Sequence, residues 1–308
     1  MSAINIVMYH YVRPIKESAF PNIKGLELEG FKRQLDFLSS KYCFVTAEDV
    51  VDAVTNDKEL PKDSCWLTFD DGYKDHFLYV LPELSKRKIQ GSFFPPVKPV
   101  TERIMLDVNS IHYILASATN IIELIEILNT ECRNLGITDD ELHRLWLEYA
   151  VASRYDTKEV IYVKRILQHA LPEPIRNEVT SKLFNKYLGV SQADFAENLY
   201  MSELDVKELV SSGMYVGSHG YRHLWLNKED EVDQKFEINK SLSFLSAVGA
   251  RTEDWIMCYP YGAYNEVTLG VLEESKCAVG VTTEVAMADL NLHHRLKMPR
   301  FNTNDFPQ

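Results

Sequence analysis

Short apolar segments, rich in β-branched and aromatic residues, alternate with amphipathic stretches along most of this chain. The alternation predicts an α/β architecture, because helices that connect successive strands leave those strands running mostly parallel. Thr46 with Asp49 and Ser202 with Asp205 have the spacing of capping boxes, so we expect helices to begin there. The predicted strands cover residues 4–12, 65–69, 91–97, 214–218, 255–259, 278–282 and 296–301.

Residues 99–200 interrupt this alternation, because they contain amphipathic helical stretches and no convincing strand. The alternation resumes after residue 200. We therefore interpret 99–200 as a helical insertion subdomain carried by one loop of a larger α/β domain, which residues 1–98 and 201–308 form together. A lid, an oligomer interface and an acceptor-recognition domain are three roles for such an insertion, and the sequence does not distinguish them.

The composition limits the partners and the location of the protein. A net charge of −12 and an isoelectric point near 5.3 disfavour nucleic acid as a partner, because phosphate backbones repel a surplus of carboxylates. The five cysteines are widely spaced and include no CxxC pair, which predicts free thiols in a reducing compartment. The N-terminus does not resemble a signal peptide, and no apolar run approaches the length of a membrane span. We therefore expect a cytoplasmic protein without a membrane span.

The first candidates for chemistry are the adjacent acids Asp70 and Asp71, which follow a predicted strand and precede Gly72. The carboxyl ends of parallel strands form the functional face of an α/β fold, so both side chains are expected to project into a cleft. The alternative is an ordinary turn, since Asp and Gly are common turn residues.

Two further predicted strands also end in polar or aromatic motifs. His219 and His223 follow one of them, and their spacing lets two imidazoles reach a single ion. Histidines at this spacing also occur without a metal, as buried or surface residues. Residues 259–262, Tyr-Pro-Tyr-Gly, follow the other strand and by themselves indicate only a rigid turn. Because the ends of parallel strands converge, we expect the acid pair, the histidine pair and this turn to lie on one face.

Together these segments resemble the signature motifs of the NodB-type polysaccharide deacetylases, the carbohydrate esterase family 4-like group. The main motifs are Thr68 to Gly72, Ser218-His219 with His223, and Tyr259 to Gly262. The resemblance extends to Met8-Tyr9-His10, Ser92-Phe93-Phe94 and Met298-Pro299-Arg300. It covers roughly residues 1–98 and 201–304, and it is strongest to the branch with a Tyr-His first strand and a Tyr-Pro-Tyr-Gly motif.

The resemblance implies a distorted (β/α) barrel of about seven parallel strands that holds one divalent metal ion. Zinc is usual in the family, with nickel, cobalt and iron as alternatives. By the resemblance, Asp71, His219 and His223 are the metal ligands and Asp70 is the general base. Such a ligand set leaves coordination positions open for water and substrate. In the family, the backbone N–H after the motif proline stabilises the oxyanion, and that residue is Tyr261 here.

Two further site residues are assigned where this chain departs from the common family pattern, His10 among them by analogy with the same branch. Many relatives take the general acid from a late Leu-x-His motif, which this chain lacks, so His10 is the candidate and His293 and His294 are its rivals. Many relatives also have an arginine that orients the catalytic Asp, at the position of Tyr259; Arg300 is the candidate to replace it. The alternatives are a structural histidine and a surface arginine.

We therefore expect a hydrolase that removes an N-acetyl group from a sugar, acting on an N-acetylated sugar or glycan intermediate of surface polysaccharide synthesis. One alternative is a deacetylase or amidase acting on a non-sugar or O-acetyl substrate, since the metal site would recognise the carbonyl group and not the rest of the molecule. Another is a catalytically silent glycan-binding protein. Three aromatic side chains either stack on a sugar ring or belong to the core: Tyr73, Trp225 and Tyr264.

Overall fold

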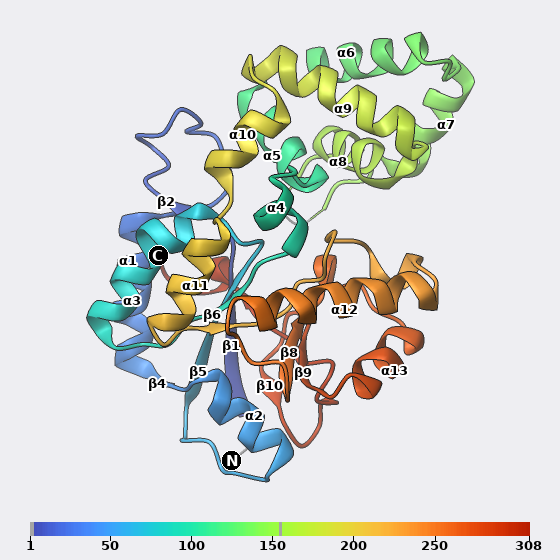
Figure 1. The fold of residues 1–308 in the computed structure, drawn as a ribbon. Helices are drawn as coiled ribbons and strands as arrows, with labels where there is room; N and C mark the ends of the chain where they lie inside the picture. Colours follow the sequence, from blue (N-terminus) through green and yellow to red (C-terminus); the bar gives the residue numbers. More distant parts are fainter. Residues whose placement is uncertain (1–2, 154–155) are drawn as a thin grey trace. The chain divides into compact units, whose positions relative to one another are not determined.

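The computed structural model describes residues 3–153 and 156–308 and divides the chain into two compact units (Figure 1). The first unit comprises Met1–Pro14, Gly25–Arg103 and Asn198–Gln308, and the second comprises Ile15–Lys24 and Ile104–Glu197. These limits lie close to the boundaries drawn from the sequence at residues 98 and 201. The grouping of residues 15–24 with the helical unit was not anticipated, because nothing in their composition sets them apart.

The first unit is built on a mostly parallel sheet with the order β10-β1-β5-β6-β7. The central strand β5 (Ser64–Asp70) runs parallel to β1 (Ala3–Tyr9) and to β6 (Ser92–Phe94). The short strand β7 (Tyr215–Val216) is parallel to β6, and β10 (Ala288–Asp289) is antiparallel to β1. Off this path, β4 (Cys43–Phe44) pairs with β5 and β11 (Phe301–Asn302) with β1.

A second parallel pair, β8 (Trp255–Cys258) and β9 (Cys277–Val281), extends this arrangement. Single parallel bridges from Ser218 to Met257 and from Val281 to Met298 connect the pair to neighbouring segments. The strands therefore continue around a closed but irregular circuit, and the predicted distorted barrel is confirmed. A separate parallel pair is formed by β2 (Val12–Arg13) and β3 (Leu26–Glu27).

Prolines shorten two of the predicted strands. The strand predicted at 91–97 ends at Phe94, because Pro95 and Pro96 offer no N–H to a neighbouring strand. The strand predicted at 296–301 was wrong in extent, since only Phe301–Asn302 is a strand and Pro299 lies between it and the bridge at Met298.

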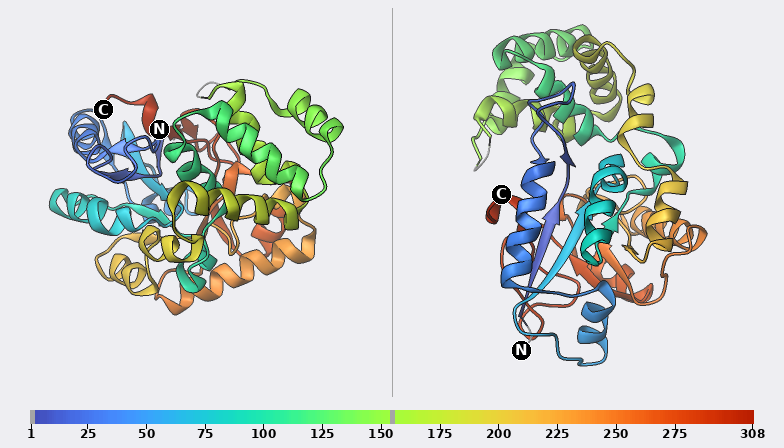
Figure 2. Two further views of the ribbon diagram at one scale, coloured as in Figure 1. Left: turned by 90° about the horizontal axis from the view of Figure 1, so that it is seen from above. Right: turned by 90° about the vertical axis from the view of Figure 1, so that its left-hand side faces the viewer.

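Seven α-helices belong to the described part of the first unit (Figures 1 and 2). Capping boxes begin α2 at Thr46 and α11 at Ser202, as predicted. The helices are α1 (Leu28–Lys41), α2 (Ala47–Thr55), α3 (Leu81–Arg87), α4 (Val97–Glu102), α11 (Glu203–Ser211), α12 (Glu231–Ala247) and α13 (Glu266–Glu274). Shorter helical turns are His76–Val80, Leu226–Lys228, Pro260–Gly262 and Thr303–Asp305.

The two faces of the central strand β5 pack against different hydrophobic clusters. Leu67 and Phe69 pack with apolar residues of α1, α3 and α11, including Phe31. Trp66 faces the other way, into a cluster with Ile256 of β8. Since side chains alternate along a strand, Thr68 and Asp70 share the face of Trp66. This alternation directs Asp70 into the interior of the barrel.

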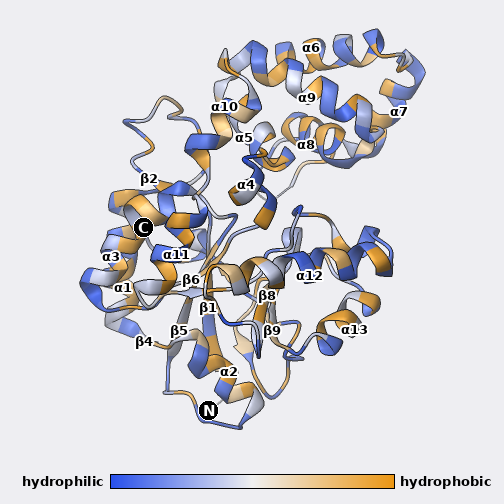
Figure 3. Cartoon of the chain, in the orientation of Figure 1, coloured by the Kyte–Doolittle hydropathy of each residue, from blue (hydrophilic) through white to orange (hydrophobic). Residues whose placement is uncertain are grey.

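Between residues 104 and 197, the described residues of the second unit form helices and no strand. Its helices are α5 (Asp107–Ser117), α6 (Ile121–Asn134), α7 (Asp139–Tyr149), α8 (Lys158–Arg165), α9 (Glu173–Leu188) and α10 (Gln192–Leu199), with a π-helical turn at Ile166–Ala170. Hydrophobic and hydrophilic residues alternate along the helices of both units (Figure 3). Among the described residues, no helix has both the length and the apolar content needed to cross a membrane.

Candidate metal centre

The acid pair lies in a tight turn at the end of β5. Asp70 is the last residue of the strand, and Asp71 and Gly72 follow with left-handed backbone conformations (φ of 70° and 68°). A Cβ atom on Gly72 would approach the Cβ of Pro95 to 2.8 Å, so only glycine fits there. The turn leaves both carboxylates buried and gives them different directions.

Asp71 meets the histidine pair. The Nε2 atoms of His219 and His223 each lie 3.3 Å from Asp71 Oδ1, and all three side chains are buried. The second oxygen, Oδ2, accepts a hydrogen bond of 2.5 Å from the Tyr73 hydroxyl. Burial by itself raises the pKa of Asp71, but hydrogen bonds from both histidines hold that pKa well below its ordinary value. Asp71 is therefore an ionised carboxylate with one oxygen facing two imidazoles.

The tautomer of His219 is fixed by its other ring nitrogen. Nδ1 donates to the backbone carbonyl of Cys258 at 2.7 Å, so Nε2, which faces Asp71, is the ring nitrogen that a metal ion could take as a ligand. His223 differs, since its buried Nδ1 has no hydrogen-bond partner among the described residues. Its ring lies against those of His219 and Tyr261, with centroid separations of 4.8 and 4.7 Å.

This donor set fits a divalent cation. One carboxylate oxygen and two imidazole nitrogens form a group that lies within 4.8 Å. Ligands at zinc distances of about 2.0–2.1 Å stand about 3.3 Å apart in tetrahedral geometry, which matches the two separations from Asp71. The structure thus brings together the three residues that the sequence resemblance assigned as ligands.

Asp70 is held by Arg300 and not by the histidines. Nη1 and Nη2 of Arg300 donate to Oδ1 and Oδ2 of Asp70 at 2.9 and 2.8 Å, and both residues are buried. Arg300 Nε donates to the carbonyl of Thr282 at 2.7 Å, which fixes the plane of the guanidinium. Burial raises the pKa of Asp70, but the charge and hydrogen bonds of Arg300, with His10 and His219, hold the pKa below its ordinary value.

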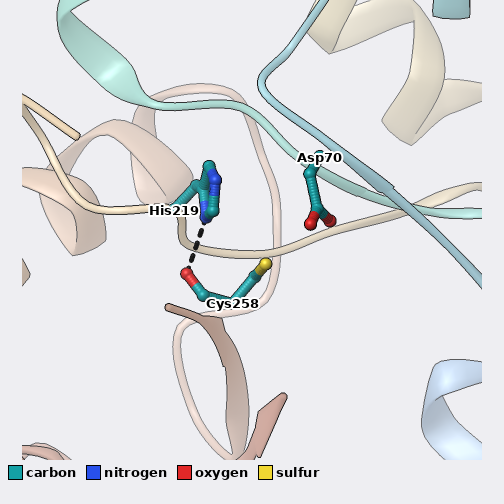
Figure 4. Close-up of side chains that lie close together, drawn as sticks. All are labelled: Asp70, His219 and Cys258. Carbon is teal, nitrogen blue, oxygen red and sulfur yellow. Dashed lines mark hydrogen bonds between the residues drawn. The ribbon is translucent and has the colours of Figure 1, made fainter. Parts of the chain in front are cut away.

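A second group of potential ligands, Asp70, His219 and Cys258, lies beside the first (Figure 4). In Figure 4 the Cys258 thiol points toward Asp70, while the Cys258 carbonyl accepts the hydrogen bond from His219. Arg300 already occupies both oxygens of Asp70 and also donates to Cys258 Sγ at 3.4 Å. A cation there would compete with this guanidinium, so the group with Asp71 is the better cation site. Cys258 could not be recognised from the sequence as a potential ligand, because a lone cysteine on an apolar strand looks like a core residue.

His10 lies next to Asp70 and is open to solvent. Its Nε2 atom is 4.0 Å from Asp70 Oδ2, and its side chain is 40% exposed. The rivals His293 and His294 lie after β10; His293 bonds to the backbone of Asp289, and His294 faces Glu273 at 4.0 Å. Of the three histidines considered as general acid, only His10 is recorded close to Asp70.

Tyr261 lies in the turn after β8 with φ of 59°, the left-handed region. Its ring stacks on Trp225 at 4.3 Å with an interplanar angle of 9°, and its edge meets His223. The turn therefore brings the Tyr261 ring beside the candidate ligand His223. Among the other aromatics, Tyr73 is fully buried with its hydroxyl on Asp71, so it cannot stack on a sugar. Tyr264 packs against Tyr259.

Known proteins share parts of this sequence. Residues 182–279 match the family model for polysaccharide deacetylase. Over 89 residues the chain is 33% identical to YxkH of Bacillus subtilis (strain 168), itself a predicted polysaccharide deacetylase. That alignment covers 29% of this chain and 32% of YxkH, so the chain matches about a third of the length of this curated relative.

Solved structures share this fold along most of the chain. The Streptococcus pyogenes deacetylase PplD, solved in complex with acetate, has a TM-score of 0.60 at 17% identity, covering 97% of this chain and 92% of PplD. A de-N-acetylase from Aggregatibacter actinomycetemcomitans has a TM-score of 0.55 at 14% identity, covering 98% of this chain and 95% of that protein. These likenesses confirm the barrel fold inferred from the motifs, and the family match over residues 182–279 agrees with the resemblance.

Proposed function

We propose that this protein is a metal-dependent hydrolase that removes the acetyl group from an N-acetylated sugar, in keeping with its polysaccharide deacetylase motifs and fold. The observation that carries the proposal is the convergence of Asp71, His219 and His223, with the ionised Asp70 beside them. Structural likeness to a deacetylase solved with acetate and to a de-N-acetylase supports the choice of an N-acetyl group.

The proposed metal ligands are Asp71, His219 and His223. A divalent ion, with zinc as our first choice, supplies Lewis-acid polarisation of a carbonyl and lowers the pKa of a water molecule. Asp70 is the general base: it takes the proton of the attacking water at Oδ2, the oxygen nearest His10. Arg300 holds Asp70 ionised and fixes its two oxygens.

The reaction also needs a group that protonates the leaving amine and a hydrogen-bond donor that stabilises the oxyanion. His10 donates the proton to the leaving amine, since its exposed imidazole faces the base across 4.0 Å. The backbone N–H of Tyr261 stabilises the negative charge that develops on the acetyl oxygen. The stacked rings of Tyr261 and Trp225 form an aromatic surface next to His223 for the sugar.

The proposal is tested by measuring acetate release from N-acetylglucosamine oligomers. Activity should stop on chelation, return on addition of Zn²⁺ or Co²⁺, and be absent from the Asp70→Asn variant. Acetate release that survives both chelation and this substitution would rule the proposal out.

A substrate panel separates the alternatives. If O-acetyl esters or a simple non-sugar amide were hydrolysed faster than N-acetylated sugars, the proposed substrate class would be wrong. The proposed metal site would be unaffected by that result. Stoichiometric metal with glycan binding and no acetate release would indicate a silent binding protein.

We also propose that the protein acts in the cytoplasm on an intermediate of surface polysaccharide synthesis. All five cysteines are unpaired, as expected in a reducing compartment. Cell fractionation tests the location, and recovery of the protein outside the cytoplasmic fraction would contradict it.

A further inference from the structure

The loop between β7 and α12 carries both histidines of the candidate metal centre, and a buried carboxylate from α12 lies beneath it. Glu237 Oε2 accepts hydrogen bonds from two consecutive backbone amides, Tyr221 N at 2.9 Å and Arg222 N at 2.8 Å. Two successive N–H groups that converge on one oxygen form an anion-binding nest. The Glu237 carboxylate thus takes the place of a bound anion and holds the segment between the two histidines.

The charge of Glu237 is compensated inside the same loop. Its side chain is fully buried, and Arg222 Nε donates to Glu237 Oε1 at 2.6 Å. Arg222 Nη2 reaches on to Asp233 Oδ1 at 2.9 Å, a carboxylate whose side chain is 47% exposed. A buried charge persists only when it is paired and hydrogen-bonded, and both oxygens of Glu237 meet that condition.

The other side of the loop is held by α4, through two backbone hydrogen bonds and one from the Tyr221 hydroxyl to Glu102 Oε1. The carbonyls of Gly220 and Tyr221 accept hydrogen bonds from Val97 N and Lys98 N, at the start of α4. A Cβ atom on Gly220 would lie 3.2 Å from Glu237 Oε2, so the glycine (φ of 72°) lets the loop approach the carboxylate closely. Among the described side chains, Glu237 is the one recorded as bonding to the amides of Tyr221 and Arg222.

The two histidines depend on this loop to different degrees. His219 is oriented directly, through its Nδ1 hydrogen bond to the carbonyl of Cys258. His223 has no such bond from Nδ1, and its backbone adopts a left-handed conformation with φ of 61° directly after Arg222. Its ring packs against those of His219 and Tyr261, and the position of its Nε2 depends on the course of the backbone before it, which Glu237 holds together with the start of α4.

We infer that Glu237 is a positioning residue for metal binding, which holds the 220–223 loop so that His223 points at Asp71. The inference rests on the metal site proposed above. Loss of a group that orients a metal ligand typically weakens metal affinity by about 10–100-fold, and we expect Glu237→Gln to fall in this range. The substitution keeps the side-chain size but places an NH₂ donor against either Arg222 or the loop amides.

The experiment measures the dissociation constant and the visible spectrum of Co²⁺ bound to the purified full-length protein. Glu237→Gln should weaken binding and alter the Co²⁺ absorption bands, because the band intensity reports coordination geometry. The matched control is Asp233→Asn, which removes the other partner of Arg222 without touching the loop amides, and we expect its affinity to match the wild type. An unchanged affinity and spectrum in folded Glu237→Gln, or an equal loss in Asp233→Asn, would overturn the inference.

A second variant covers the case in which Glu237→Gln does not fold. Arg222→Lys keeps the charge and both backbone bonds but removes the bond from Nε to Oε1, so we expect a smaller loss of Co²⁺ affinity, about 3–10-fold. Unaltered binding by this variant would then overturn the inference. Wild-type protein that binds no Co²⁺ would instead refute the proposed metal site itself, so the two failures are distinguishable.

Discussion

Arg300 and Asp70 form a buried, two-pronged ion pair, with N···O distances of 2.9 and 2.8 Å between residues 230 positions apart in the chain. The pair gives the two adjacent acids different partners. Asp70 remains an ionised carboxylate that no imidazole engages at hydrogen-bonding distance, while Asp71 faces His219 and His223. Two neighbouring residues thus occupy different electrostatic surroundings, as a base and a ligand require.

Replacing Arg300 should affect both stability and the pH profile. Arg300→Gln leaves Asp70 buried without a counter-charge, and breaking a buried pair in this way costs about 3–5 kcal/mol of unfolding free energy, to be measured by urea denaturation. Arg300→Lys keeps a charge but loses the two-pronged contact, so the pKa of Asp70 rises. The acidic limb of the kcat/KM profile should then move to higher pH, because the base must be ionised.

The control for this series is Arg295→Lys. Arg295 lies five residues earlier, is partly exposed and bonds to the carbonyls of Cys277 and Ala278 instead of an active-site acid. Its pH profile should match that of the wild type. An Arg300→Lys profile that coincides with the wild type would mean that Arg300 does not set the ionisation of Asp70.

The barrel and the convergence of its motifs were predictable because they depend on local patterns. Strand segments, capping boxes at Thr46 and Ser202, and glycine turns are each encoded by a short stretch of sequence. The carboxyl ends of parallel strands lie on one face independently of the lengths of the loops that connect them. Arg300 was identified through the family resemblance, as a residue at the end of the last predicted strand whose planar fork suits a carboxylate.

Long-range side-chain contacts were not predictable in the same way. Glu237 lies on α12, where a glutamate normally faces solvent, and only the fold shows that it is buried under a loop. Tyr73 looks like an aromatic platform in the sequence, but the left-handed turn at Asp71 folds its hydroxyl back onto that carboxylate. The pairing of residues 15–24 with the helical unit likewise depends on contacts across about 100 residues of sequence, which no local pattern encodes.

His10 should be essential for turnover but not for metal binding. Its Nε2 lies 4.0 Å from Asp70 and its side chain reaches solvent, as suits a proton donor to a leaving amine. His10→Gln should lower kcat by about 10²–10⁴-fold and leave the Zn²⁺ content unchanged. His293→Gln and His294→Gln serve as controls and should retain activity. If one of these controls loses activity while His10→Gln keeps it, the general acid lies elsewhere.

Tyr73→Phe should lower the affinity of the site for metal without leaving a cavity in the core. The hydroxyl donates to Asp71 Oδ2 at 2.5 Å, and the ring, stacked on Tyr11, is kept in the variant. Outer contacts of this kind are worth about 10–100-fold in metal affinity, and we expect the Zn²⁺ dissociation constant to rise toward the lower end of that range.

The comparison variant is Tyr259→Phe, a buried tyrosine whose hydroxyl donates to the carbonyl of Leu296. It should lose some stability but keep its Zn²⁺ affinity. Equal Zn²⁺ affinities for the Tyr73→Phe variant and the wild type would show that Tyr73 does not orient Asp71.

His76 should make the protein sensitive to acid. It is fully buried among the rings of Phe69, Tyr73 and Phe93, and Nε2 donates to the carbonyl of His10 at 2.8 Å. Nδ1 has no hydrogen-bond partner among the described residues, so protonation would place an uncompensated charge there. Burial lowers the pKa of His76 to about 4.

The sign of the effect follows from proton uptake. Between about pH 6.5 and pH 4 the unfolded chain binds a proton at this histidine and the folded chain does not, so stability is lost as the pH falls through this window. The loss approaches about 3 kcal/mol near pH 4. His76→Gln, whose amide can still donate to the carbonyl of His10, should flatten the dependence of urea midpoint on pH in this range. The exposed His294→Gln should leave the wild-type slope in place, and a His76→Gln slope equal to that of the wild type would assign the acid sensitivity to other groups.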